Sequence, residues 1–277
     1  MARWFKRIVL AVLLLAVVLV ATAAVVAWRA GRTPPWYATA VDQTPPDEAA
    51  DRVIDRQFVP MQNWLARTSA GDLAARPDAE KVHTLDLTDA DVNAVIAKFF
   101  DHQRGEAETF RVRFDTDAIE LAFNLTQYGR TASVTTAIAR TADGRPTVAL
   151  GPVRVGEQTA PSWLLDRFTA GPAARVRTEL DQLKRTGKPP RIDERDAASQ
   201  NTVKAAYGRM LLDILAGRAV PPPALLPVSR EGDDFVATRV TQLDATPGRL
   251  RVTFRMMTPV ERDELLAELN GPLPGEK

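Results

Sequence analysis

The first thirty residues constrain this chain more than any other segment. An apolar run from Ile8 to Trp28 contains no charged residue, and basic residues flank it on both sides: Arg3, Lys6 and Arg7 before it, Arg29 and Arg32 after it. About twenty apolar residues in a helix, at a rise of 1.5 Å each, span the roughly 30 Å hydrocarbon core of a bilayer. We therefore expect residues 1–30 to form a cytoplasmic tip and a transmembrane anchor.

A cleaved secretory signal peptide is the alternative interpretation of the same run. Ile8 to Val20 has the length of a signal-peptide core, and Ala21-Thr22-Ala23 has the small-x-small form of a cleavage site. The apolar character continues beyond that site to Trp28, which favours an uncleaved anchor with an interfacial aromatic residue. The basic residues slightly favour a cytoplasmic N-terminus, so we expect a single-pass cell-membrane protein with an extracytoplasmic C-terminal domain.

Composition limits the rest of the chain. The 277 residues include no cysteine, which excludes a lipid-modified cysteine anchor and structural disulfides. Lysine plus arginine (36) almost equals aspartate plus glutamate (35), so net charge gives no electrostatic reason to expect a nucleic-acid partner. We expect residues 31–46 to be a proline-rich, extended spacer and residues 47–277 to form one extracytoplasmic α+β domain.

Two helices are predicted in the first part of this domain. One begins with Thr44 as N-cap, is interrupted at Pro60, and has an apolar face made of Ile54, Phe58, Met61 and Leu65. The other begins at Thr88, which together with Asp91 forms a capping pattern. Its expected buried stripe is Val92, Val95, Ile96, Phe99 and Phe100.

Alternating apolar residues then predict four consecutive strands. Phe110, Val112 and Phe114 alternate with arginines, and Ile119, Leu121, Phe123 and Leu125 follow after a short turn. Two further strands surround the Asp143-Gly144 turn and end near Val155. Short turns between consecutive strands indicate an antiparallel meander, and the alternation predicts that the first hairpin has one solvated face.

The C-terminal half is predicted to contain three more helical stretches and a hairpin. A helical segment with Leu164, Leu165 and Phe168 is expected to break at Gly171-Pro172 and resume towards Leu183. The next helix has an apolar stripe of Val203, Tyr207, Met210, Leu211, Ile214 and Leu215. A hairpin surrounds Pro247-Gly248, and Thr258 begins a last helix. These elements predict an α+β fold in which a transmembrane helix precedes a curved antiparallel sheet packed on amphipathic helices.

No segment carries a recognisable catalytic, cofactor or metal motif, so we expect a protein that is not an enzyme and needs no cofactor or metal. The two histidines, His83 and His102, would support catalysis only if they met carboxylates in one pocket. Asn93, in the apolar helix that follows Thr88, is interpreted as a structural hydrogen-bonding residue rather than a ligand contact.

The order of segments resembles a known family. An anchor, a proline-rich spacer, a helix containing Leu87-Thr88-Asp89-Ala90-Asp91-Val92-Asn93-Ala94-Val95, and long alternating strands are similar to YpmS-like membrane-anchored bacterial proteins of unknown function. Val153-Arg154-Val155-Gly156 followed by Pro161 is similar to a strand-to-helix turn in LmeA-like phospholipid-binding proteins. Both resemblances imply a TULIP-like architecture, in which a curved sheet around a helix holds lipid in an apolar groove.

Two hypotheses about function follow. In the first, an anchored envelope protein binds a lipid or another apolar ligand beside its own membrane. The expected groove-lining residues are Phe99, Phe110, Phe114, Leu121, Phe123, Leu125 and Trp163. In the second, the domain is a non-enzymatic scaffold or assembly module that presents a surface to another envelope protein. A concave apolar groove favours the first hypothesis, and an exposed apolar patch favours the second.

Overall fold

The structure is a computed structural model that describes residues 29–43, 45–69, 81–101, 109–125, 129–186, 188–193, 197–227 and 235–273. The expected anchor, Ile8 to Trp28, lies outside the described residues, as does the predicted cap Thr44. Among the residues described, no helix combines the length and the apolar character needed to cross a bilayer.

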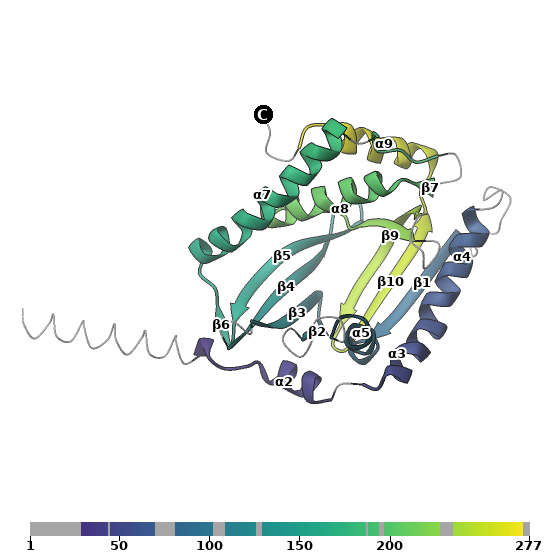
Figure 1. Cartoon of the computed structure of the whole chain (residues 1–277). Helices are drawn as coiled ribbons and strands as arrows, with labels where there is room; N and C mark the ends of the chain where they lie inside the picture. Colours follow the sequence, from purple (N-terminus) through teal and green to yellow (C-terminus); the bar gives the residue numbers. More distant parts are fainter. Residues whose placement is uncertain are drawn as a thin grey trace, which may run out of the picture.

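The domain contains two antiparallel sheets where one curved sheet was expected (Figure 1). The first, here called the β9 sheet, has the order β1 (Val82–Thr88), β10 (Arg249–Met256), β9 (Phe235–Thr246) and β7 (Ala197–Ala198), with β8 (Pro223–Pro227) also paired to β9. The second, the β4 sheet, has the order β2 (Phe110–Asp115), β3 (Ala118–Leu125), β4 (Arg130–Arg140), β5 (Pro146–Val155) and β6 (Gln158–Thr159). Both sheets are open, and the α+β class is confirmed.

The predicted strands form where their alternation placed them. The meander is the β4 sheet, and the last hairpin is β9 with β10, closed at Gly248, whose φ of 77° suits glycine. Strand β1 was not predicted. It pairs with β10 in a register that sets Leu85 opposite Val252, although more than 160 residues of sequence separate the two strands, so no local turn signal reveals the pairing.

One apolar core joins the two sheets. Buried side chains of both sheets pack together with the helices beside β1, and the cluster includes Phe114, Ile138, Val240, Phe254 and Leu65. Backbone hydrogen bonds also join the sheets. Gly248 N–H donates to the Phe114 carbonyl, and Asp117 N–H donates to the Ala245 carbonyl. The domain is therefore one folding unit rather than two separate layers.

The first predicted helix forms in three parts. α3 (Asp47–Val53) continues through a π-helical turn, η1 (Ile54–Phe58), into α4 (Val59–Ser69). The irregular turn directly precedes Pro60, which has no N–H to donate to the preceding turn. The predicted interruption is thus confirmed, and Met61 and Leu65 are buried as expected.

The helix after Thr88 is confirmed with its cap. α5 (Asp89–Ile96) begins with a capping box in which Thr88 and Asp91 satisfy each other's backbone N–H groups, and it continues as the π-helical η4 (Ala97–Asp101). Asn93 has the structural role predicted, since its side chain makes two hydrogen bonds with the backbone of Val112, at 2.9 and 2.7 Å. Phe99 does not belong to the buried stripe, because it is 43% exposed.

Three helices cover one end of the sheets (Figure 1): α7 (Ser162–Thr186), α8 (Gln200–Leu215) and α9 (Pro259–Asn270). The predicted break at Gly171-Pro172 is wrong, since α7 continues through Pro172. The predicted stripe is confirmed only in part for α8, in which Val203 and Ile214 pack against apolar core clusters. Its buried residues are Thr202, Ala205, Ala206, Arg209 and Leu212, whereas Tyr207 and Leu211 are exposed. Small and polar residues form the buried side of α8 because α7 packs closely against it. At Gly208, an added Cβ would lie 3.0 Å from a methyl carbon of Leu180.

The predicted spacer and the predicted solvated face both required correction. Within residues 31–46, Pro35–Asp42 forms a helix, α2, rather than an extended segment, because Pro35 occupies its first turn, where no N–H is needed. α2 covers the polar face of the β4 sheet, where Tyr37 donates a hydrogen bond to the Thr109 carbonyl at 2.8 Å. Arg111 is fully buried there and donates to the Ala40 carbonyl at 3.0 Å.

The residues that follow the expected anchor are also built into the domain. Glu157 N–H donates to the Arg29 carbonyl at 3.1 Å, and the Glu157 carboxylate lies 3.5 Å from the Arg32 guanidinium. Gly156 has a φ of +59°, and an added Cβ would lie 2.6 Å from the carbonyl oxygens of Ala30 and Arg32. The turn between β5 and β6 is therefore in close contact with residues 29–32.

Candidate functional site

The described side chains that were predicted to line an apolar groove lie at different places, in the core, at its edge and on the surface. Phe114 belongs to the shared core and Leu121 packs against that core. Phe110 and Phe123 face each other across β2 and β3, with ring centroids 5.7 Å apart, while Phe99 is largely exposed. The other two predicted lining residues are Leu125 and Trp163. Their backbones lie in β3 and α7, but their side chains are outside the described residues.

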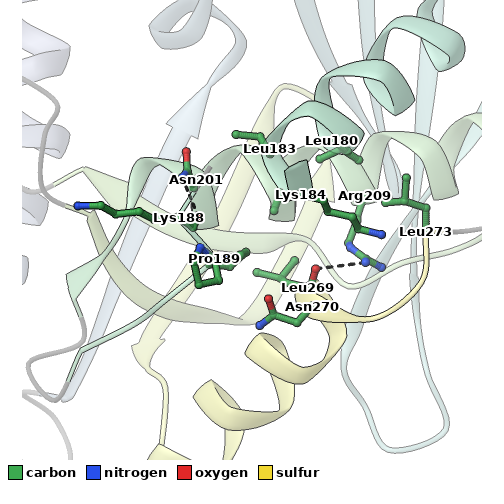
Figure 2. Close-up of a pocket in the computed structure, with 12 residues that line it drawn as sticks. Leu180, Leu183, Lys184, Lys188, Pro189, Asn201, Arg209, Leu269, Asn270 and Leu273 are labelled. Atoms are coloured by element: carbon green, nitrogen blue, oxygen red, sulfur yellow. Dashed lines mark hydrogen bonds between the residues drawn. The ribbon is translucent and has the colours of Figure 1, made fainter. Parts of the chain in front are cut away.

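A different site lies between α7, α8 and α9, here called the helical pocket (Figure 2). Its volume is about 160 Å³. Its twelve lining residues come from the C-terminal half of α7, the proline-containing segment after it, the buried face of α8, and the end of α9: Leu180, Leu183, Lys184, Lys188, Pro189, Pro190, Asn201, Ala205, Arg209, Leu269, Asn270 and Leu273.

Leucines form the apolar part of the helical pocket. Leu180, Leu269 and Leu273 are buried and belong to a second apolar cluster, against which Leu183 packs. The cluster includes residues of α7, α8 and α9 and the inner strands β8 and β9. The pocket therefore has a fixed apolar surface supported by the sheet beneath it.

The polar part of the helical pocket has one sign of charge. Lys184 and Lys188 are exposed, Arg209 is buried, and no aspartate or glutamate occurs among the described residues that line the pocket. Neither lysine forms an ion pair with a described carboxylate. Because the whole chain has almost balanced charge, this concentration of cations is a local property.

Arg209 is a structural cation of the pocket wall. Its guanidinium donates to the carbonyl oxygens of Pro272 at 2.9 Å and of Leu269 at 3.2 Å, and also to that of Gly271. These carbonyls at the end of α9 have no partner within the helix. The buried positive charge therefore closes the end of α9 against α8, as the dashed line in Figure 2 shows for Leu269.

Hydrogen bonds also fix the segment that carries Lys188. Asn201 donates from Nδ2 to the Lys188 carbonyl at 2.9 Å, and this contact is drawn in Figure 2. The fully buried Thr202 hydroxyl accepts from Arg191 N–H at 2.8 Å and donates to the Arg191 carbonyl at 2.9 Å. Two neighbouring residues of α8 thus hold residues 188–191 in place, so this rim of the pocket is formed before any ligand arrives.

A second hollow, which Arg209 also lines, has residues of both charges in its lining. It has a volume of about 220 Å³ and is lined by four acidic side chains, together with Arg145 and Arg239: Asp213, Glu261, Glu264 and Glu268. Hydrogen bonds from Arg255, with further ones from Thr258 and Arg239, keep the pKa of Glu261 well below its ordinary value. Arg209 therefore lies between a hollow whose charged lining residues are all basic and one whose lining residues carry both charges.

The described residues contain no site that supports a catalytic role for the histidines or a bound metal. No group of three or more metal-ligating side chains occurs among those residues, and His102 lies outside them. The His83 ring stacks on Trp64 with 5.5 Å between centroids, and partial burial lowers the pKa of His83.

Sequence reasoning missed the helical pocket because its parts have ordinary local explanations. The segment from Lys184 to Asp196 is polar and contains two prolines, and Arg209 interrupts a helix that was predicted from its apolar residues. One signal was present: Lys184 and Lys188 surround the end of a helix, and two prolines follow them. Comparisons with protein-family models, curated proteins and solved structures gave no match for this chain.

Proposed function

We propose that this protein is a membrane-tethered, non-enzymatic module that presents its helical pocket to another protein of the cell envelope. The observation that carries the proposal is the pocket itself, whose rim is fixed and whose two exposed lysines, Lys184 and Lys188, form no ion pair with a described carboxylate. An exposed cationic site on a rigid support is suited to docking, because little order is lost when a partner binds.

The position of the pocket supports the same proposal. α7 begins three residues after β6, next to the turn that contacts Arg29, and it has 25 residues, so its far end lies about 37 Å away. Figure 1 shows this far end beside α9, well separated from α2 and the start of the described chain. With the apolar run Ile8–Trp28 in the bilayer, the pocket faces away from the membrane that holds the domain.

The size of the pocket favours a protein partner over a stored lipid. Small-molecule pockets have volumes of roughly 300–1,000 Å³, whereas the helical pocket has about 160 Å³. That space accommodates one or two side chains but not an acyl chain with its head group. A larger hollow of about 310 Å³ lies beside α2, but none of the residues predicted to bind an apolar ligand lines it, and the described ones are distributed among the core and the surface.

Site-specific photocrosslinking in native membranes tests the proposal. A photoreactive phenylalanine analogue replaces Pro189 at the exposed rim, and Ala174, exposed on the same side of the fold but outside the pocket, serves as the matched control. We expect one stoichiometric protein adduct from position 189 and none from position 174. Adducts with lipid alone, or no adduct specific to position 189, would contradict the proposal.

A further inference from the structure

We infer that the occupant of the helical pocket is an acidic, extended segment of the partner protein that places an apolar side chain on the leucines. This inference rests on the proposed function and specifies the chemistry of the same site. It follows from three properties of the pocket: the sign of its charge, the positions of its lysines, and its leucine surface.

Charge complementarity is the first argument. Three cations line the pocket without a described acidic side chain, and Arg209 is already engaged with backbone carbonyls. Lys184 and Lys188 remain available at the rim, and each ammonium carries three donors. Carboxylates are the groups that such lysines bind in a protein partner, and the charges also steer the partner towards the pocket.

Shape is the second argument. Figure 2 shows the Lys184 side chain directed towards Arg209, whereas the Lys188 side chain extends outward, away from the other residues that line the pocket. A single compact anion contacts one of these lysines, whereas an extended chain with acids on both sides of an apolar residue contacts both. Recognition of short acidic motifs by basic side chains is a recurring mode of peptide binding.

A fluorescence-anisotropy titration tests this inference on the full-length protein in phosphatidylcholine nanodiscs. The probe is a fluorescein-labelled hexapeptide, acetyl-EDLEDL, and we expect saturable binding that weakens as salt increases. The double substitution K184Q/K188Q should reduce the affinity about tenfold, because two exposed charge pairs are lost. The reversal K184E/K188E should abolish binding.

Matched controls separate a specific site from general attraction. Arg177 on α7 and Lys204 on α8 are exposed cations that do not line the pocket, so R177Q/K204Q should leave the affinity unchanged. The neutral peptide acetyl-QNLQNL should not bind, and acetyl-EDSEDS should bind several-fold more weakly because it lacks the leucines. Equal effects of the two double substitutions, or equal binding of the three peptides, would overturn the inference.

Other occupants give distinct results. Displacement of the peptide by 10 mM inorganic phosphate, or by phosphatidylglycerol vesicles through the same two lysines, would show an anion or lipid site and would overturn the inference. A variant that ends at Leu273 removes the four following residues, which include Glu276. A more than tenfold gain in affinity on this truncation would identify the chain's own C-terminus as the occupant.

The inference and the proposed function fail in different ways. If the crosslinked partner persists at position 189 in K184Q/K188Q membranes at an unchanged level, the acidic occupant is wrong while the docking function stands. If acetyl-EDLEDL binds as described but no partner crosslinks, the docking function is wrong while the specificity of the pocket stands.

Discussion

At the residue scale, the sequence pattern did not reveal that two arginines, Arg111 and Arg209, are buried. Arg111 alternates with apolar neighbours in β2 and so was assigned to a solvated face, yet it is fully buried beneath α2. Arg209 lies on the buried side of α8. In both cases the guanidinium binds backbone carbonyls of a distant segment. Burial of a charge requires such partners, and they are invisible in the local sequence.

Replacement of Arg209 by alanine should destabilise the domain by about 3 kcal/mol, because several carbonyls at the end of α9 lose a charged donor and remain partly buried. For a domain of this size, that change lowers the melting temperature by roughly 6–12 °C. Thermal unfolding monitored by circular dichroism gives the value. The exposed Lys204 on the same helix is the control, and K204A should change stability by less than about 0.5 kcal/mol. Equal melting temperatures for the two variants would contradict the assigned role of Arg209.

At the scale of helices and strands, the sequence predicted correctly the features that depend on contacts between residues close in the chain. The capping boxes at Thr88 and Thr258 formed as predicted, since each depends on residues three positions apart. Strand β1, helix α2 and the continuity of α7 were not predictable in this way. β1 depends on pairing with β10, and α2 is held by the β4 sheet through Tyr37. Tertiary contacts decide these elements and can override local propensity.

α9 provides a prediction of pH dependence. Glu261 closes the capping box of α9 and also accepts hydrogen bonds from Arg255 and Arg239 of the β9 sheet, which lower its pKa from 4.5. A carboxyl group whose pKa is lower in the folded state stabilises the fold fully above its unfolded pKa, and loses this effect as the pH falls towards the folded pKa. The contribution of Glu261 should therefore be constant from pH 7 to 5 and decline below about pH 4.5.

The variant E261Q isolates this contribution. The melting temperature of the unaltered protein should exceed that of E261Q most above pH 5, and the difference should shrink by roughly half by pH 3. E264Q, at an exposed position on the same helix, should follow the unaltered protein at every pH. A difference between the unaltered protein and E261Q that stays constant from pH 7 to 3 would disprove the linkage.

At the scale of the whole molecule, the fold class was predictable and the division into two sheets was not. The order of the strands β2 to β5 in the β4 sheet followed from alternation and turns, whereas the two-residue strand β6 was not predicted. The separation of β9 and β10 from that meander, with β1 added at one edge, depends on which apolar faces meet in the shared core. The helical pocket depends on the same long-range packing, so the sequence alone could not locate it.

The contact between the β5–β6 turn and residues 29–32 gives a prediction about the whole molecule. G156A adds a Cβ that meets three backbone carbonyls, so residues 29–32 should separate from the turn. Limited trypsin digestion in nanodiscs, followed by mass spectrometry, should show several-fold faster cleavage after Arg29 and Arg32. G144A is the matched control, since its φ is also positive, at +80°, but nothing lies near the added Cβ. Equal cleavage in the two variants would contradict the contact.

The attachment of residues 29–42 to the β4 sheet has a mechanical consequence. A flexible linker lets a tethered domain move freely above the bilayer. Here, hydrogen bonds at Glu157 and at Tyr37 hold residues 29–42 against the β4 sheet. If the apolar run Ile8–Trp28 inserts in the bilayer as proposed, this attachment limits how freely the domain can turn about its anchor. The proposed docking site then lies near the far end of α7, about 37 Å along the helix axis from the contact with residues 29–32.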